Sequence, residues 1–312
     1  MAELLNIFSW SHSRAKMHQE CLRQYYWNYY GSWNGWRQEA PSQARLAYRL
    51  KQMKSMAMWA GDITHRVIEH YLRALRSGQQ PITPDALRDE ARSLLNREWA
   101  QSVRREWERD PKRCCNLFEH YYNQSVAKEQ RVELREHIFA CLERFGQSDA
   151  LRRIQTAGSL QWAALEDLQQ FLVMKVPVWV KLDIAIQDAE GFIIFDWKTG
   201  QQRQDDDEQA RSYILFAMSF WQKAPEAIQA RMIYLRDGAE KSIRADAAAL
   251  IEHRETIMAS MKRMQALLAD PANNQPLPMD EFAMTEDRNK CQRCNFHQIC
   301  FPSGEIPCQT KS

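Results

Sequence analysis

The stretch from residue 180 to 200, VKLDIAIQDAEGFIIFDWKTG, constrains the fold of this chain more than any other part of its sequence. It contains two runs rich in β-branched and aromatic residues, 178–186 and 192–195, separated by turn-forming residues at 189–191. This pattern predicts two antiparallel strands joined by a tight turn. Because neighbouring strands of a hairpin lie side by side, polar residues of both strands are brought together.

The rest of the chain alternates between helical and strand-like patterns. Further short strands are predicted at 171–173, 230–235 and 242–244, and helical periodicity is found at 14–30, 43–77, 84–107, 116–145, 209–222 and 246–268. We expect a break in the second helix near Gly61 and a helix start at Thr83–Pro84, where the threonine caps and the proline needs no N–H. Helices that flank a compact group of strands predict a mixed α/β fold.

Three polar side chains stand out in the predicted hairpin. Asp196 and Lys198 are two residues apart, so they project from one face of their strand, and the hairpin places Asp183 beside Asp196. Two carboxylates and one ammonium suit Mg²⁺ or Mn²⁺, which prefer oxygen ligands. Such an ion neutralises a scissile phosphate and activates a water, which Lys198 positions or helps to deprotonate. A surface ion pair explains an isolated D-x-K equally well, so the flanking motifs matter.

Two further pairs of polar residues are spaced for one helix face. His65 and Glu69 are four residues apart, and the imidazole is a suitable metal ligand. Gln209 and Tyr213 have the same spacing and offer an amide and a phenol to DNA or to the carboxylates. Each pair alone is also typical of ordinary helix packing.

Taken in order, G-x-x-x-H-x-x-x-E, Asp, D-x-K-T-G and Q-x-x-x-Y resemble the motif series of RecB-like nucleases of the PD-(D/E)XK superfamily, over a span of Cys21 to Cys300. The resemblance implies a nuclease core with a mixed central sheet flanked by helices. It implies metal ligation by His65, Asp183, Asp196 and the Trp197 carbonyl, catalytic roles for Lys198, Asp183, Asp196 and Glu69, and substrate contacts from Gln209 and Tyr213. Two features depart from the family pattern. Val180 stands where the family often has glycine, and residues 79–157 form a larger helical insertion than compact members carry.

Composition narrows the setting of the protein. The net charge is only +2, from 42 Lys+Arg against 40 Asp+Glu, so overall charge does not mark a nucleic-acid binder. No run approaches the roughly 18 apolar residues of a membrane span, and the first residues lack the pattern of a signal peptide. We therefore expect a cytoplasmic protein without membrane contact. In a reducing compartment, eight cysteines favour metal binding over disulfides.

Three cysteines near the C-terminus, Cys291, Cys294 and Cys300, have metal-ligand spacing, and Cys21 is the candidate for the fourth ligand. One N-terminal and three C-terminal cysteines resemble the iron–sulfur arrangement of the AddB nuclease domain and of CRISPR-adaptation exonucleases. The resemblance implies a [4Fe–4S] cluster, and a Cys₄ zinc site is the chemical alternative. The segment 287–308 would then pair with the region around Cys21 and join both ends of one nuclease domain, 1–312. Cys308 is a spare thiol, and Cys114, Cys115 and Cys141 are expected to be ordinary buried thiols.

Together these features predict a metal-dependent deoxyribonuclease that acts on single-stranded DNA or DNA ends, with exonuclease action favoured. The resemblance suggests DNA repair and recombination, CRISPR adaptation or phage defence, with a helicase or integrase as partner. The sequence has no P-loop, so ATP-driven unwinding would belong to that partner. The alternative is a DNA-binding scaffold subunit with weak catalysis. We interpret the acidic run 205–208 as the N-terminal turn of a helix.

Overall fold

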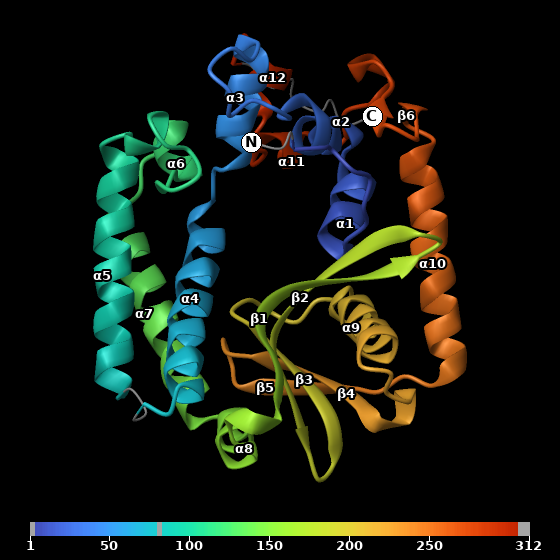
Figure 1. The fold of residues 1–312 in the computed structure, drawn as a ribbon. Helices are drawn as coiled ribbons and strands as arrows, with labels where there is room; N and C mark the ends of the chain where they lie inside the picture. The colour runs from blue at the N-terminus through green and yellow to red at the C-terminus, as the bar shows by residue number, and fades with distance from the viewer. Residues whose placement is uncertain (1–3, 80–82, 305–312) are drawn as a thin grey trace. The chain divides into compact units, whose positions relative to one another are not determined.

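The computed structural model describes residues 4–79 and 83–304 (Figure 1). Cys308 and the end of the predicted 287–308 segment therefore lie outside the described residues. The chain forms two compact units, here called unit 1 and unit 2. Unit 1 comprises Met1–Ser55, Trp99–Asn123 and Ile257–Ser312, and unit 2 comprises Met56–Glu98 and Gln124–Thr256. The predicted insertion, 79–157, contributes to both units, and the assignment of one domain to 1–312 stays a prediction.

Unit 2 contains the sheet. Its strands are β1 (Trp162–Val173), β2 (Val176–Asp188), β3 (Gly191–Lys198), β4 (Ile228–Tyr234) and β5 (Ala239–Ile243), in that spatial order. Only the β3–β4 pair is parallel; the other neighbours are antiparallel. The predicted α/β class with a mixed sheet is confirmed. β1 is far longer than the predicted 171–173, because this edge strand alternates buried and exposed residues instead of forming an apolar run.

The β2–β3 hairpin forms as the sequence predicted. Asp188 pairs with Gly191 and Ile184 with Phe195, which fixes the register of the two strands. Gly191 has a φ of +121°, and an added Cβ there would lie 2.7 Å from the Ala227 carbonyl oxygen, so only glycine fits this turn. The chain then returns through a helix to the parallel strand β4, as a crossover connection requires.

Unit 2 also contains helices, namely α4 (Met56–Arg76), α7 (Lys128–Gln147), α8 (Asp149–Ala157), α9 (Asp206–Phe220), most of α5 (Pro84–Val103) and the first half of α10 (Ala247–Gln265). Of these, α4, α8 and α9 pack against the sheet. α9 packs against β1, β2, β4 and β5, whereas α4 packs against α7 and β1 (Figure 1). The acidic run ends in the first turn of α9, as predicted. Thr83 Oγ1 accepts a hydrogen bond from the Ala86 amide at 3.3 Å, which confirms the predicted start of α5.

The predicted helix break near Gly61 is wrong. α3 (Ser42–Lys51) ends before residues 52–55, and α4 then runs without interruption through Gly61. The prediction failed because glycine was treated as a breaker, whereas this one serves a close contact described below.

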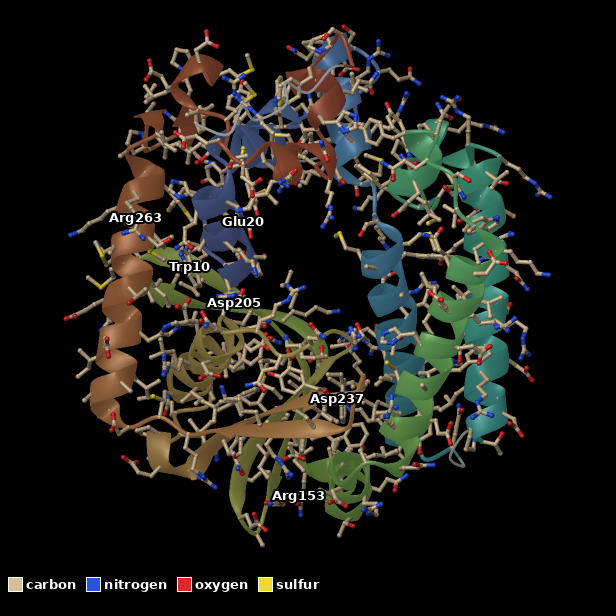
Figure 2. The ribbon with its side chains drawn as sticks, turned by 180° about the vertical axis from the view of Figure 1, so that it is seen from behind. Trp10, Glu20, Arg153, Asp205, Asp237 and Arg263 are labelled. Atoms are coloured by element: carbon tan, nitrogen blue, oxygen red, sulfur yellow. The ribbon has the colours of Figure 1, made fainter. Side chains whose placement is uncertain are left out.

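Unit 1 joins sequence from both ends of the chain. It contains α1 (His12–Glu20), α2 (Leu22–Tyr26), the π-helical turn η1 (Trp27–Gly31), α3, α6 (Phe118–Tyr121), α11 (Arg288–Gln292), α12 (His297–Cys300) and the short strands β6 (Leu268–Asp270) and β7 (Gln275–Pro276). Trp10 donates to the Ser260 hydroxyl at 3.2 Å (Figure 2), and Arg23 Nε donates to the Phe282 carbonyl at 2.8 Å. These contacts join the N- and C-terminal segments through ordinary protein interactions. No helix among residues 4–79 and 83–304 is long and apolar enough to cross a membrane.

Candidate active site

The two aspartates of the hairpin lie together in the interior of unit 2. Asp183 and Asp196 are only 6% and 4% exposed, on the adjacent strands β2 and β3. The Trp197 amide donates a hydrogen bond to Asp183 Oδ2 at 2.7 Å, so the hairpin register sets the position of this carboxylate. Burial, together with the charge of Asp196, raises the pKa of Asp183. Two carboxylates this close and this buried favour a bound cation.

Lys198, Gln209 and Tyr213 form a closed ring of contacts with Asp196. The Lys198 ammonium lies 2.7 Å from Asp196 Oδ2 and donates to Gln209 Oε1 at 2.7 Å. Gln209 Nε2 donates to the Tyr213 hydroxyl at 2.6 Å, and that hydroxyl donates to Asp196 Oδ1 at 2.7 Å. Each member is thus held by two others. Gln209 and Tyr213 are four residues apart on α9, so both side chains lie on one face of this helix and reach the end of β3.

His65 reaches the same cluster from α4. Its Nδ1 lies 3.6 Å from Asp183 Oδ2, and desolvation lowers the pKa of the imidazole, which leaves it neutral as a metal ligand must be. Glu69, one turn further along, forms an ion pair with Arg73 at 2.8 Å. The structure therefore brings His65 to Asp183, whereas Glu69 pairs with Arg73 on its own helix and its charge also raises the pKa of Lys181 on β2.

Glu166 is the site residue that sequence reasoning missed. It lies on β1 with a φ of +52°, and the flanking pairs Leu165–Ile184 and Asp167–Leu182 place it opposite Asp183. Its side chain is 1% exposed, and ligand atoms of His65, Glu166 and Asp183 all lie within 4.8 Å of one another. Burial and the Asp183 charge raise the pKa of Glu166 to about 7, although Lys181 opposes the shift. A buried glutamate in a strained backbone conformation is typical of a functional position.

Gly61 lets α4 approach the end of β3. A Cβ added at Gly61 would lie 3.2 Å from the Thr199 hydroxyl oxygen. Thr199 directly follows Lys198, so this contact connects the helix that carries His65 to the strand that carries Asp196. The G-x-x-x-H-x-x-x-E and D-x-K-T-G motifs of the sequence are therefore in contact at Gly61. Val180, where the family often has glycine, is buried on β2 opposite Gln169.

The family model of the PD-(D/E)XK nuclease superfamily matches residues 9–301. The chain belongs to this superfamily. Membership implies nuclease activity and the use of a divalent metal, and the matched residues include parts of both units. No curated protein matches the chain. The crystal structure of SSO0001 is 16% identical and covers 66% of this chain and 84% of its own, with a TM-score of 0.29, which is too low to support any argument.

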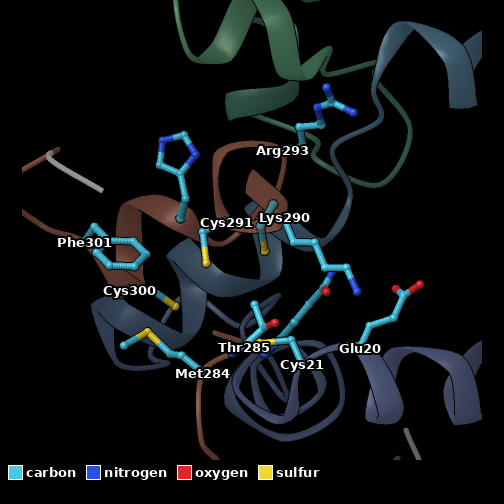
Figure 3. A pocket seen from close by; sticks show the side chains of 12 residues that line it. Glu20, Cys21, Met284, Thr285, Lys290, Cys291, Arg293, Cys300 and Phe301 are labelled. Carbon is cyan, nitrogen blue, oxygen red and sulfur yellow. Dashed lines mark hydrogen bonds between the residues drawn. The ribbon is translucent and has the colours of Figure 1, made fainter. Parts of the chain in front are cut away.

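Unit 1 of this superfamily member contains a cavity of about 240 Å³ lined by all four predicted ligand cysteines (Figure 3). Cys21 sits where the predicted helix 14–30 is interrupted: its backbone is extended, with φ −164° and ψ 114°, between α1 and α2. Its Sγ accepts from the Gln24 and Thr285 amides at 3.5 and 3.4 Å. The extended backbone turns the thiol out of the helix, a local feature that helical periodicity does not reveal.

The four cysteines of this cavity form no disulfides; Cys291 is buried and the other three are partly buried. Burial raises the pKa of Cys294 to about 12 and that of Cys300 to about 11, and the other cysteines add to both shifts. The Trp27 indole N–H is buried without a hydrogen-bond partner of normal geometry in the described part of the chain, and it favours the thiolate form of Cys300. No three cysteine sulfurs among the described residues lie within 4.8 Å of one another.

Proposed function

We propose that the protein is a RecB-like deoxyribonuclease that hydrolyses phosphodiester bonds with Mg²⁺ or Mn²⁺. The observation that carries the proposal is the closed ring of Lys198, Gln209, Tyr213 and Asp196, with Asp183 beside it. A purely structural role requires neither two buried carboxylates at the end of a hairpin nor an ammonium locked against one of them. The resemblance of the motif series to RecB-type nucleases supports exonuclease action on single-stranded DNA or DNA ends, with a helicase or integrase as partner.

We assign the catalytic ion to His65, Asp183, Asp196 and the Trp197 carbonyl. The donor set fits a divalent ion, because carboxylate and carbonyl oxygens with one neutral imidazole suit Mg²⁺ or Mn²⁺. When bound, such an ion neutralises the scissile phosphate and lowers the pKa of a coordinated water. The side chains of the protein would align the attacking water with the scissile phosphate.

Lys198 is the residue that we assign to the attacking water and the phosphate. Burial alone lowers the pKa of its amine, but Asp196 and Asp183 more than offset this and raise the pKa, so the side chain is an ammonium. An ammonium has three donors, and Asp196 and Gln209 occupy two of them. The third is available for a phosphate oxygen or the water. Lys198 therefore acts by positioning and charge.

We further propose that Cys21, Cys291, Cys294 and Cys300 hold a [4Fe–4S] cluster, as in the AddB nuclease domain. Four thiols, the buried Trp27 indole N–H that favours the Cys300 thiolate, and amide donors to sulfur suit a thiolate-bound cluster. A tetrahedral zinc site requires sulfurs about 3.8 Å apart, given Zn–S bonds of about 2.3 Å.

The test of the nuclease is cleavage of labelled single- and double-stranded DNA by anaerobically purified protein, with Mg²⁺ or Mn²⁺. Asp196→Asn and Lys198→Met should each lower the rate by at least about 10²-fold, because each removes charge stabilisation that the transition state needs. Lys223→Met is the matched control, because Lys223 donates an exposed hydrogen bond to Gln187. This variant should cleave DNA at the wild-type rate. Equal cleavage by all proteins would assign the activity to a contaminant and favour a DNA-binding scaffold.

A further inference from the structure

Lys181 is a second lysine of the metal cluster, and the motif series does not include it. It lies two residues before Asp183 on β2, so both side chains project from the same face of the strand. Its ammonium lies 2.5 Å from Glu166 Oε2, although the side chain as a whole is 55% exposed. Lysine normally extends its amine into water. Here the amine is directed inward, onto a carboxylate that is 1% exposed.

Glu166 has the geometry of a metal ligand rather than of a simple ion-pair partner. Both of its carboxylate oxygens are buried, and neither has a hydrogen-bond partner of normal geometry among residues 4–79 and 83–304, although Oε2 forms the ion pair with Lys181. It shares a cluster of ligand atoms, all within 4.8 Å of one another, with His65 and Asp183. Without Lys181, this group would offer a divalent ion two carboxylates and an imidazole, in addition to the site between Asp183 and Asp196.

We propose that the Lys181 ammonium replaces a second divalent ion, so that the site works with one metal ion. This inference rests on the proposed function, because it assumes that one ion is bound at Asp183 and Asp196. The ammonium pairs with Glu166. Within the ligand group found among the described residues, Glu166 is the member that we have not assigned to the first ion, since His65 and Asp183 already belong to it.

Charge balance supports a single ion. With an ion bound, ionised Glu166, Asp183 and Asp196 supply three negative charges, and the paired Lys181 and Lys198 supply two positive ones. One divalent ion leaves a single positive charge, which one phosphodiester neutralises. A second divalent ion would leave two further positive charges buried without compensation, which is costly in a site of low dielectric.

The test counts bound Mn²⁺ per chain by equilibrium dialysis at pH 8, with the full protein. We expect one ion in the wild type and two in Lys181→Met, because removal of the ammonium frees Glu166. The double variant Lys181→Met/Glu166→Gln should return to one ion. Lys175→Met, at an exposed lysine of the β1–β2 turn, is the matched control and should also bind one. Melting curves verify that each variant is folded.

Two results would overturn the inference. A wild type that binds two ions shows that Lys181 does not exclude the second, and a folded Lys181→Met that still binds one shows that Glu166 does not accept it. A wild type that binds no ion is a different failure, because it removes the catalytic ion of the proposed function and the inference with it. The wild-type count therefore separates the two hypotheses.

Discussion

The carboxylate site in unit 2 and the cysteine cavity in unit 1 are the two sites that we propose for metals, and the protein prepares them differently. Asp196 is held by Lys198 and Tyr213, and Asp183 by the Trp197 amide, so the oxygens are in place through contacts within the chain. The cysteine thiols line an open cavity of about 240 Å³ and have few donors. We therefore propose that the carboxylate site is shaped before an ion binds, whereas the cysteine cavity depends on its occupant for cohesion.

This comparison predicts how much folding free energy is lost when either site loses its metal. Metal affinity becomes folding free energy where no preformed site exists without the metal. We therefore expect disruption of the cysteine cavity to affect stability most, and disruption of the ring around Asp196 to affect catalysis most. The contacts of Trp10 and Arg23 still join the ends of the chain, so unit 1 does not depend on its cysteines alone.

Cys21→Ala is expected to have the largest effect. Loss of one thiolate should release the cluster, and thiolate metal sites contribute on the order of 10 kcal/mol to folding. The visible absorption of anaerobically purified protein should disappear, and the melting temperature should fall by about 10 °C or more. Cys114→Ala, in the same unit but outside the cavity, should change neither by much. A Cys21→Ala variant with the spectrum and stability of the wild type would contradict the cluster assignment.

Tyr213→Phe tests whether the ring, rather than direct substrate contact, is what matters. The lost hydroxyl donates to a buried carboxylate, a hydrogen bond that contributes about 1.5–3 kcal/mol, so kcat should fall by about 10- to 100-fold. KM should change little, because Tyr213 acts through Asp196 and Gln209. Tyr234→Phe removes a similar buried hydrogen bond, to Asp206 at 2.8 Å outside the ring, and should retain kcat. A rise in KM alone would instead make Tyr213 a substrate-binding residue.

Gly61→Ala should have a smaller effect, on both stability and catalysis. The new Cβ would lie 3.2 Å from the Thr199 hydroxyl, so α4 or the residues after Lys198 must shift by a few tenths of an ångström. We expect a loss of about 1 kcal/mol in unfolding free energy and a several-fold lower kcat. Gly146→Ala, in α7 with nothing near its Cβ, should instead stabilise by up to about 1 kcal/mol. Equal effects of the two substitutions would show that the Thr199 contact is unimportant.

Local patterns and non-local contacts explain which parts of this molecule were predictable. The hairpin, with Asp183, Asp196 and Lys198, was evident because strand periodicity and a turn lie within 21 residues of sequence. The fit of Gly61 against Thr199 was not, because it depends on how two distant elements pack. Glu166 was missed for a related reason. It lies on an edge strand with a mixed polar pattern, and only the pairing of β1 with β2 brings it opposite Asp183.

The smallest effect is expected for an ion pair that belongs to neither site. Arg153 on α8 (Figure 2) donates through Nε to Asp188 Oδ2 at 2.5 Å, and this hydrogen bond holds the pKa of Asp188 below its ordinary value. A lowered carboxyl pKa contributes stability above the ordinary pKa of about 4, and that contribution is lost as the pH falls through the folded-state pKa. Asp188→Asn should therefore cost about 1 kcal/mol or less at pH 7. Urea unfolding should show the difference from wild type shrinking as the pH is lowered below about 4.

Because both side chains are partly exposed, at 20% and 17%, this pair measures what an ordinary contact contributes without a metal. An unchanged difference at low pH would assign the effect to packing, and a cost as large as that of Cys21→Ala would remove the contrast between the two metal sites and the rest of the molecule.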